Sequence, residues 1–266
     1  ILQFIQENPT IDQSEIADLL HIKRCTVAVH IANLTKKGVI KGKGYILGEP
    51  EESYILGIGA ANVDINCHTK YAINLRDSNP GYLQYSFGGV THNVCMNAAL
   101  LGADVKFISA IGDDENGEGL IKEAMEAGMD LSHVLRVKNH PSSTYISFAD
   151  DKGDMFVAFS DMRVMENMTV EFIRKNASVL KRAKLITIDP SIPVPVIEEL
   201  VNVYAKEVPL YVDPVSIAYA RVIKPYLGAF QMCKPNVYEL EVLSDMKIET
   251  DEDLQKACRQ VLSTGL

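Results

Sequence analysis

Asn62 and Asp64 combine residue types and a position that suggest ligand binding. They follow an apolar run over residues 54–58, which predicts a buried strand. Because ligands of α/β sheets bind outside the carboxyl ends of parallel strands, we expect both side chains at such an edge. A carboxylate there can accept hydrogen bonds from two hydroxyl groups, which would orient a sugar. The structural alternative is a turn asparagine followed by a capping aspartate.

A glycine pair and an asparagine form a second candidate binding group. Gly88 and Gly89 stand before an expected helix that ends near Leu101, and glycines at a helix start let a ligand approach the backbone closely. Asn93 lies one turn into this helix, where its amide can donate to or accept from a further hydroxyl. An ordinary buried asparagine is the alternative for this position.

Strands and helices alternate along the chain from residue 54 onward. Alternation at this spacing predicts βαβ units, and therefore a mostly parallel sheet with helices on both faces. The expected strands cover residues 54–58, 105–108, 185–188 and 210–212, and the helical stretches between them include 94–101 and 117–127. Two segments, 67–87 and 144–159, look like antiparallel strands, the second as a hairpin around residues 150–153. We therefore expect an α/β fold with a small β lid.

The composition is that of an ordinary globular protein. Of the 266 residues, 47% are hydrophobic and 23% charged, so the chain can bury a full core and is not disordered. The net charge of −9 argues against nucleic-acid binding by the chain as a whole. Residues 21–43, however, contain no acid and six bases: Lys23, Arg24, Lys36, Lys37, Lys41 and Lys43. This basic stripe predicts contact with an anionic partner.

Cysteine usage and the N-terminus indicate a reducing compartment. The five cysteines are odd in number and form no C-x-x-C pair, which argues against a disulfide framework or a zinc cluster. The N-terminal residues lack the basic and apolar regions of a signal peptide. No apolar run approaches the roughly 18 residues that span a bilayer. We expect a cytoplasmic protein.

Residues 1–48 predict a small domain of three short helices and a hairpin. Asp12 can cap the second helix, and the third helix carries Val27, Ile31 and Leu34 as one apolar stripe. Two short apolar strands are expected around residues 42–44. This layout resembles a winged helix-turn-helix. An acidic, proline-containing linker over residues 49–53 would separate it from the rest of the chain.

The winged helix-turn-helix resemblance implies a DNA-binding domain. Its third helix would enter the major groove, where Thr26 and Asn33 could read bases. Cys25 and Val29 lie on the same face and cannot make bidentate base contacts. The basic stripe would meet phosphates. The alternative is a helical dimerisation module whose lysines are merely solvated.

Four motifs within residues 54–266 resemble the ribokinase-like (PfkB) family of sugar and nucleoside kinases. They are Gly59-Ala60-Ala61-Asn62-Val63-Asp64, Gly88-Gly89-Val90-Thr91-His92-Asn93, Ile111-Gly112-Asp113-Asp114-Glu115-Asn116-Gly117 and Lys234-Pro235-Asn236-Val237-Tyr238-Glu239. Further segments at residues 142–145, 156–162 and 212–216 are most similar to pseudouridine kinases. Tyr219 departs from that subgroup, which carries a lysine a few residues after the last of these segments.

The kinase resemblance implies ATP and Mg²⁺ as cofactors, with a monovalent cation as a further candidate. Asn236 and Glu239 would organise phosphate and Mg²⁺, the metal through water, although their spacing also fits a helix capping box. The lid would exclude water from the sugar, with Thr144, Tyr145 and Asp161 near the base. Tyr145 could equally pack as a strand residue within the lid. Family lids and winged helices often pair, so a homodimer is expected.

The resulting hypothesis is an ATP-dependent kinase with a fused DNA-binding regulatory domain. It would phosphorylate a ribose-containing molecule, with pseudouridine, converted to its 5′-phosphate, as the leading substrate. Kinases of ribose, another sugar or adenosine are alternatives, as is a non-catalytic regulator that senses a sugar or nucleoside.

The catalytic base of the family lies in a late Gly-Ala-Gly-Asp motif, which the 266 residues do not contain. We therefore expect the kinase domain over residues 54–266 to be truncated at its C-terminus. Because loss of a general base costs about 10²–10⁴ in rate, we expect negligible kinase activity from these residues alone.

Overall fold

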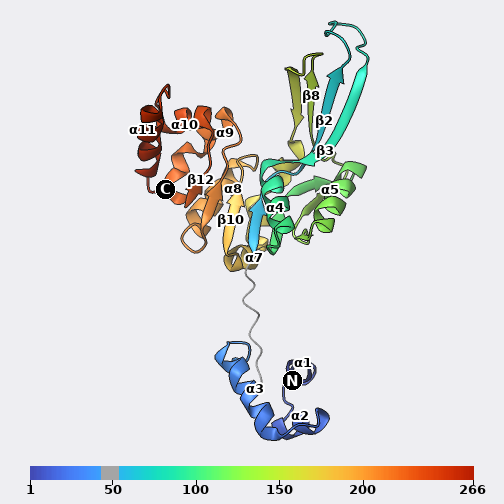
Figure 1. The fold of residues 1–266 in the computed structure, drawn as a ribbon, viewed down its shortest axis with the longest axis vertical. Helices are drawn as coiled ribbons and strands as arrows, with labels where there is room; N and C mark the ends of the chain where they lie inside the picture. Colours follow the sequence, from blue (N-terminus) through green and yellow to red (C-terminus); the bar gives the residue numbers. More distant parts are fainter. Residues whose placement is uncertain (43–53) are drawn as a thin grey trace. The chain divides into compact units, whose positions relative to one another are not determined.

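The computed structural model describes residues 1–42 and 54–266. The chain divides into two compact units, Ile1–Glu52 and Ser53–Leu266 (Figure 1). Lys43, most of the expected hairpin and the expected linker at residues 49–53 lie outside the described residues. No helix in the described ranges has the length and apolar character that crossing a membrane requires.

The described part of the N-terminal unit, residues 1–42, contains three helices. They are α1 (Leu2–Glu7), α2 (Gln13–Leu19) and α3 (Arg24–Lys36). The carboxylate of Asp12 accepts hydrogen bonds from two backbone N–H groups in the first turn of α2, so the predicted cap is present. Val27 and Ile31 of α3 are buried in one cluster with Ile5 and Ile16 of the other helices. The apolar stripe of α3 therefore forms the small core of this unit.

The larger unit is built on a six-stranded sheet in the order β12-β11-β10-β1-β4-β6. Its strands are β1 (Ile55–Ile58), β4 (Val105–Ile108), β6 (Met129–Asp130), β10 (Leu185–Ile188), β11 (Leu210–Val212) and β12 (Met232–Cys233). Every pairing in this sheet is parallel. The apolar runs predicted as strands make up its centre, because a parallel sheet covered on both faces buries continuous Val, Ile and Leu runs.

Helices cover both faces of the parallel sheet. They are α4 (Val90–Leu100), α5 (Glu115–Glu126), α6 (Val170–Lys175), α7 (Ala177–Arg182), α8 (Val194–Glu199), α9 (Ile217–Ile223), α10 (Val237–Ser244) and α11 (Asp251–Leu262), with short helical turns η1 (Arg163–Asn167), η2 (Leu200–Tyr204) and η3 (Lys224–Ala229). Leu56 and Ile58 belong to a buried cluster with α7, α8 and α10, whereas Phe107 joins α4 and α5 in a second cluster. The expected α/β fold is confirmed.

Helix α4 packs closely on β1 because residue 57 has no side chain. A Cβ at Gly57 would stand 2.2 Å from Cys95 Sγ and 2.8 Å from the ring of Phe107. Both atoms belong to the buried cluster beneath α4, so the glycine sets the distance between helix and strand. This packing brings the first turn of α4 to the carboxyl end of β1.

A second sheet, which we call the lid, extends away from the parallel sheet (Figure 1). Its strands are β2 (Asn62–Thr69), β3 (Gly81–Gly88), β8 (Ser143–Ala149) and β9 (Met155–Asp161), in the order β3-β2-β8-β9. The β2–β3 and β8–β9 pairs are antiparallel, as expected, but β2 and β8 are parallel. The difference arises because the chain reaches β8 through β4, α5 and the short β5–β7 pair (Ala110–Gly112, Leu135–Val137), not through a hairpin turn.

Asn62 and Asp64 lie in the lid, whereas the sequence analysis predicted them at the carboxyl end of a parallel strand. β1 ends at Ile58, and β2 begins at Asn62, which pairs with Gly88 of β3. Only residues 59–61 separate the two strands. Because this connection is so short, both side chains remain beside the carboxyl ends of the parallel strands.

Candidate functional site

A cavity of about 360 Å³ lies between the lid and the carboxyl ends of the parallel strands. We call it the lid cavity. It brings together Asn62, Asp64, Gly89, Asn93 and Tyr145, all predicted from the sequence. Its other polar walls are Ser160, Asp189, Ser191, Ser216 and Tyr219. Hydroxyl, amide and carboxylate groups around a cavity of this size suit a small ligand that carries several hydroxyls.

Asp64 provides a half-buried carboxylate in the lid cavity. Its Oδ1 accepts a hydrogen bond from Asn62 Nδ2 at 2.5 Å, which orients the group. Burial raises the pKa of Asp64, and the Asn62 hydrogen bond opposes that rise. A Cβ at Gly88 would stand 2.2 Å from Asp64 Oδ2, so the first glycine of the pair makes room for the carboxylate. The result is a positioned acceptor for hydroxyl donors.

Position 89 requires glycine for a different reason. Its φ is +106°, and a Cβ there would stand 2.2 Å from the carbonyl oxygen of Ala60. Gly89 is the N-cap of α4, and it has no side chain to bind the free N–H groups of the first helical turn. Those groups must find an acceptor elsewhere in the fold.

Asp189 is the acceptor for one of these groups, the N–H of Thr91, and it is absent from the residues predicted by sequence. Its side chain is almost fully buried, and Oδ2 accepts a hydrogen bond from the backbone N–H of Thr91 at 3.1 Å. Its Oδ1 accepts from the backbone N–H of Ser191 at 3.0 Å and from the Ser191 hydroxyl. Burial raises the pKa of Asp189 in spite of these donors. The positive end of the α4 dipole favours a carboxylate at this place.

The position of Asp189 in the sequence is the signal that could have revealed it. Asp189 directly follows the apolar run of β10, and Asp213 directly follows that of β11. Each aspartate is followed by a proline, which ends the strand. Polar residues at the carboxyl ends of neighbouring parallel strands converge on one edge of the sheet.

Tyr219 lines the lid cavity from α9. Ser216 caps this helix, because its hydroxyl accepts a hydrogen bond from the backbone N–H of Tyr219 at 3.3 Å. Burial raises the pKa of Tyr219, and the nearby carboxylate of Asp189 raises it further. Position 219 therefore contributes a phenol that can form hydrogen bonds, in place of the lysine mentioned above.

A second, more open cavity of about 680 Å³ adjoins the lid cavity. Val90, Asn93 and Val215 line both of them. The polar groups of this outer cavity are Asn97, Asp213, Lys234, Asn236 and Glu239. Lys234 Nζ lies 3.1 Å from Asp213 Oδ2 and is largely exposed, so its charge can also meet an anion in the cavity.

Asn236 and Glu239 form the capping box of α10. The Asn236 side chain accepts from the backbone N–H of Glu239 at 3.0 Å, and Glu239 Oε2 accepts from that of Asn236 at 2.9 Å. No group of three or more His, Cys, Asp or Glu side chains suited to a metal occurs in the part of the chain that the structure describes. One carboxylate cannot hold Mg²⁺ by itself, but it suits a hydrated ion bound chiefly by phosphates.

Thr144 and Asp161 lie on the opposite face of the lid from the lid cavity. They pair with each other across β8 and β9, whereas their neighbours Tyr145 and Ser160 form the next pair and line the cavity. Successive strand residues point to opposite faces, so only one of the two pairs can meet a ligand. Asp161 is instead bound by Arg163, whose guanidinium lowers the pKa of Asp161 to about 2.

The predicted DNA-contacting side chains of the N-terminal unit are exposed along α3 and after it. This holds for Lys23, Arg24, Thr26, Asn33, Lys36, Lys37 and Lys41. Lys43 falls outside the described residues. Lys23 is the N-cap of α3, and Lys36 lies in its last turn, so positive charge is present at both ends of the helix. The exposed face between them contains Cys25 and Val29.

Comparison with known proteins identifies both units. Residues 52–266 match the pfkB family of carbohydrate kinases. Residues 1–41 match the winged helix-turn-helix DNA-binding family.

Two relatives from Escherichia coli match over most of the chain. A protein described as the uncharacterized sugar kinase YeiI is 36% identical over all 266 residues, which cover 73% of its length. Pseudouridine kinase is 32% identical over 216 residues, which cover 81% of this chain and 69% of that protein. A solved ribokinase from Arabidopsis thaliana, complexed with ribose and ATP, has a TM-score of 0.67 at 21% identity and covers 80% of this chain and 69% of its own. The last comparison shows the shared fold.

The raised pKa of Asp189 predicts a pH-dependent stability. The folded chain binds a proton there more readily than the unfolded chain, so the contribution of Asp189 is greatest below its ordinary pKa of 3.8 and declines as pH rises through the folded-state value. Asp189→Asn removes this titration. We expect the free energy of unfolding of the wild type, relative to Asp189→Asn, to fall as the pH rises above about 4. Urea unfolding at a series of pH values measures it, and a pH-independent difference would contradict it.

Proposed function

Because the chain belongs to the pfkB family of carbohydrate kinases, we propose that its larger unit binds a ribose-containing molecule and ATP for phosphoryl transfer to the primary hydroxyl. The supporting observation is that the lid cavity, with Asp64, adjoins the outer cavity, with Asn236 and Glu239. A sugar in the first and phosphates in the second would meet at their shared wall. The acceptor hydroxyl belongs at that junction.

The residues that line the two cavities would have distinct roles in the reaction. Asp64 accepts hydrogen bonds from sugar hydroxyls, with Asn62 holding the carboxylate in place and Asn93 available for a further hydroxyl. Lys234 and the first turn of α10 face the phosphates. ATP with hydrated Mg²⁺ supplies the phosphoryl group, and Glu239 would contact the ion through water. A monovalent cation stays a prediction.

Pseudouridine is the leading substrate. Similarity to a pseudouridine kinase over most of the chain supports this choice. The lid cavity also offers Tyr145, Ser160 and Tyr219 beside the sugar-binding carboxylate, and their hydroxyls can both donate to and accept from a base. Ribose, another sugar and adenosine are the competing substrates. Tyr219, in place of a lysine, sets this cavity apart from the pseudouridine kinase pattern.

Removing the Asp64 carboxylate tests the kinase proposal. Hydrogen bonds to a charged group contribute about 1.5–3 kcal/mol, so Asp64→Ala should weaken nucleoside binding by about 10–100-fold or more. The measurement is ADP release by the full-length gene product with pseudouridine, uridine, adenosine and ribose, together with calorimetric binding of each. Asp151→Asn, an exposed aspartate in the β8–β9 turn, is the control and should leave both unchanged.

Two results would count against this kinase. If the wild type binds one of the four compounds but phosphorylates none, a sensing role replaces catalysis. If Asp64→Ala retains wild-type affinity, the sugar does not occupy the lid cavity. The 266 residues alone are expected to release no ADP above background.

For the N-terminal unit we propose DNA binding, so that the kinase would also act as a regulator. The match to winged helix-turn-helix proteins and the exposed basic stripe support this. Phosphate contacts dominate such binding and make it sensitive to salt. Thr26 and Asn33 are the base-reading candidates, because Cys25 and Val29 lack bidentate donors and acceptors.

Charge reversal on α3 tests the DNA-binding proposal. Lys36→Glu combined with Lys37→Glu should raise the Kd for the DNA upstream of the gene by about tenfold or more at low salt. Two lysine–phosphate contacts are lost, and two glutamates that repel the phosphates are introduced. The matched control is Lys122→Glu with Lys175→Glu, which alters two exposed lysines of the larger unit by the same charge. A gel shift measures both. Equal weakening by the two pairs would indicate a nonspecific charge effect.

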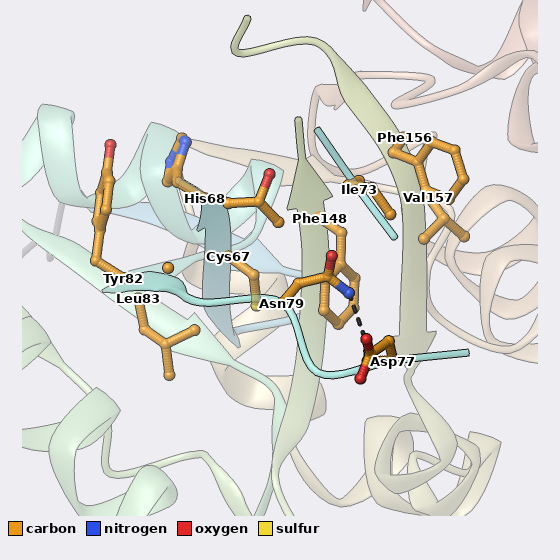
Figure 2. Close-up of a pocket in the computed structure, with 12 residues that line it drawn as sticks. Cys67, His68, Ile73, Asp77, Asn79, Tyr82, Leu83, Phe148, Phe156 and Val157 are labelled. Carbon is orange, nitrogen blue, oxygen red and sulfur yellow. Dashed lines mark hydrogen bonds between the residues drawn. The ribbon is translucent and has the colours of Figure 1, made fainter. Parts of the chain in front are cut away.

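The outer face of the lid supports the expected homodimer. Register pairs place Cys67, Leu83, Phe148 and Val157 on one face of the lid, opposite the face that carries Asp64 and lines the lid cavity. Leu83, Phe148 and Val157 are each at least 41% exposed. These side chains line a hollow of about 440 Å³ together with Ile73, Asp77 and Asn79 (Figure 2). We propose that a second copy of the lid covers this face.

A negative charge placed on one face or the other of strand β3 tests whether the lid forms the dimer interface. Leu83→Glu should shift the wild-type dimer toward monomer, because the dimer would bury the new carboxylate against apolar side chains. Gln84→Glu, the next residue of β3 on the other face, is the control and should leave the mass unchanged. Light scattering after size exclusion measures the mass. A monomeric wild type, or a dimer insensitive to Leu83→Glu, would contradict the proposal.

A further inference from the structure

Val215 has a backbone conformation that valine rarely adopts. Its φ is +65°, in the left-handed region, where a side chain branched at Cβ meets the backbone. The described residues contain five non-glycine positions with positive φ: His21, Arg76, Asn139, Val215 and Asp245. Val215 is the one among them that is branched at Cβ. Such strain persists only where surrounding contacts enforce it.

Contacts on both sides of Val215 enforce this conformation. The backbone N–H of Val215 donates to Asp213 Oδ1 at 3.0 Å, and the N–H of Ser216 donates to the carbonyl of Pro214 at 2.6 Å. Asp213 is itself held, because its Oδ2 is ion-paired with Lys234. Ser216 is held as the cap of α9. The loop between β11 and α9 is therefore tied to both neighbouring elements.

The strained residue stands where the two cavities meet. Val215 lines the lid cavity, with Asp64 and Tyr219, and it also lines the outer cavity, with Lys234 and Glu239. The other residues shared by the two cavities, Val90 and Asn93, both come from α4. Val215 is thus the contribution of the β11–α9 loop to the common wall, opposite the first turns of α4. Its isopropyl group is apolar and partly exposed.

We infer that Val215 is a positioning residue for phosphoryl transfer, an inference that rests on the proposed kinase function. Its left-handed backbone holds the isopropyl group as an apolar wall at the junction. In the reaction the acceptor oxygen bonds to the γ-phosphorus while the bond to the ADP oxygen breaks, and the hydroxyl proton passes to a carboxylate base. Water at the same place would yield ADP and free phosphate. The wall fixes the acceptor hydroxyl and occupies the volume that water would take.

A change to glycine separates strain from function. Val215→Gly adopts a positive φ freely, so the thermal unfolding midpoint should stay within about 2–4 °C of the wild type or rise. In the full-length gene product we expect the transfer rate to fall by about 10–100-fold, since small misplacements at a reacting centre have effects of that size. The ratio of ADP to phosphorylated nucleoside should rise well above one, because water gains access.

Two further variants complete the test. Val215→Asn tolerates a positive φ and retains a side chain of similar volume, so it should restore coupling between ADP release and nucleoside phosphorylation. Arg76→Gly relieves a positive φ at an exposed position in the connection between β2 and β3, away from both cavities, and should leave the kinetic constants unchanged.

The outcomes are distinguishable from failure of the kinase proposal. Wild-type protein that phosphorylates no nucleoside defeats the proposed function, and the inference with it. An active wild type whose rate and ADP ratio are matched by Val215→Gly defeats the inference alone. A Val215→Gly protein that loses activity together with a marked drop in its unfolding midpoint shows a structural role and likewise overturns it.

Discussion

The buried carboxylate of Asp189 is the interaction on which the geometry of the site depends. It binds the backbone of Thr91 in the first turn of α4 and the backbone and hydroxyl of Ser191 after β10. A charge removed from water in this way is tolerated because several donors and a helix N-terminus surround it. One side chain thereby joins the end of a central strand to the start of the helix whose first turns line both cavities.

Glycines make that junction possible. A Cβ at Gly59 would stand 2.3 Å from Asp189 Oδ2, and a Cβ at Gly57 would collide with Cys95 of α4. A Cβ at Gly88 would likewise collide with the Asp64 carboxylate, and a Cβ at Gly89 with the carbonyl oxygen of Ala60. The four positions share one physical requirement, which is that another group approaches the backbone within a distance that any side chain would prevent: a carboxylate at Gly59 and Gly88, a thiol at Gly57 and a backbone carbonyl at Gly89. The glycine motifs therefore act first on the packing of the site and through it on the ligand.

The lid uses the alternation of strand residues for two purposes. Asp64, Tyr145 and Ser160 share the face that closes the lid cavity, while Leu83 and Phe148 are exposed apolar side chains on the opposite face. The sequence analysis expected Thr144, Tyr145 and Asp161 all to lie near the base of the substrate. Side chains at adjacent strand positions, such as Thr144 and Tyr145, cannot meet the same ligand. Pairing register decides which of them does, and register depends on contacts between distant segments.

The sequence by itself determined the elements of this protein and the family to which it belongs. Apolar runs predicted the central strands, Asp12 and the Asn236–Glu239 spacing predicted helix caps, and residue-level motifs indicated a kinase fold, because each of these signals is local in the chain. Tertiary structure alone decided that Asn62 and Asp64 lie in the lid, that Asp189 joins β10 to α4, and that a strained Val215 stands between two cavities. These features arise where segments far apart in the chain meet, 98 residues apart for Thr91 and Asp189, so no local pattern encodes the contacts between them.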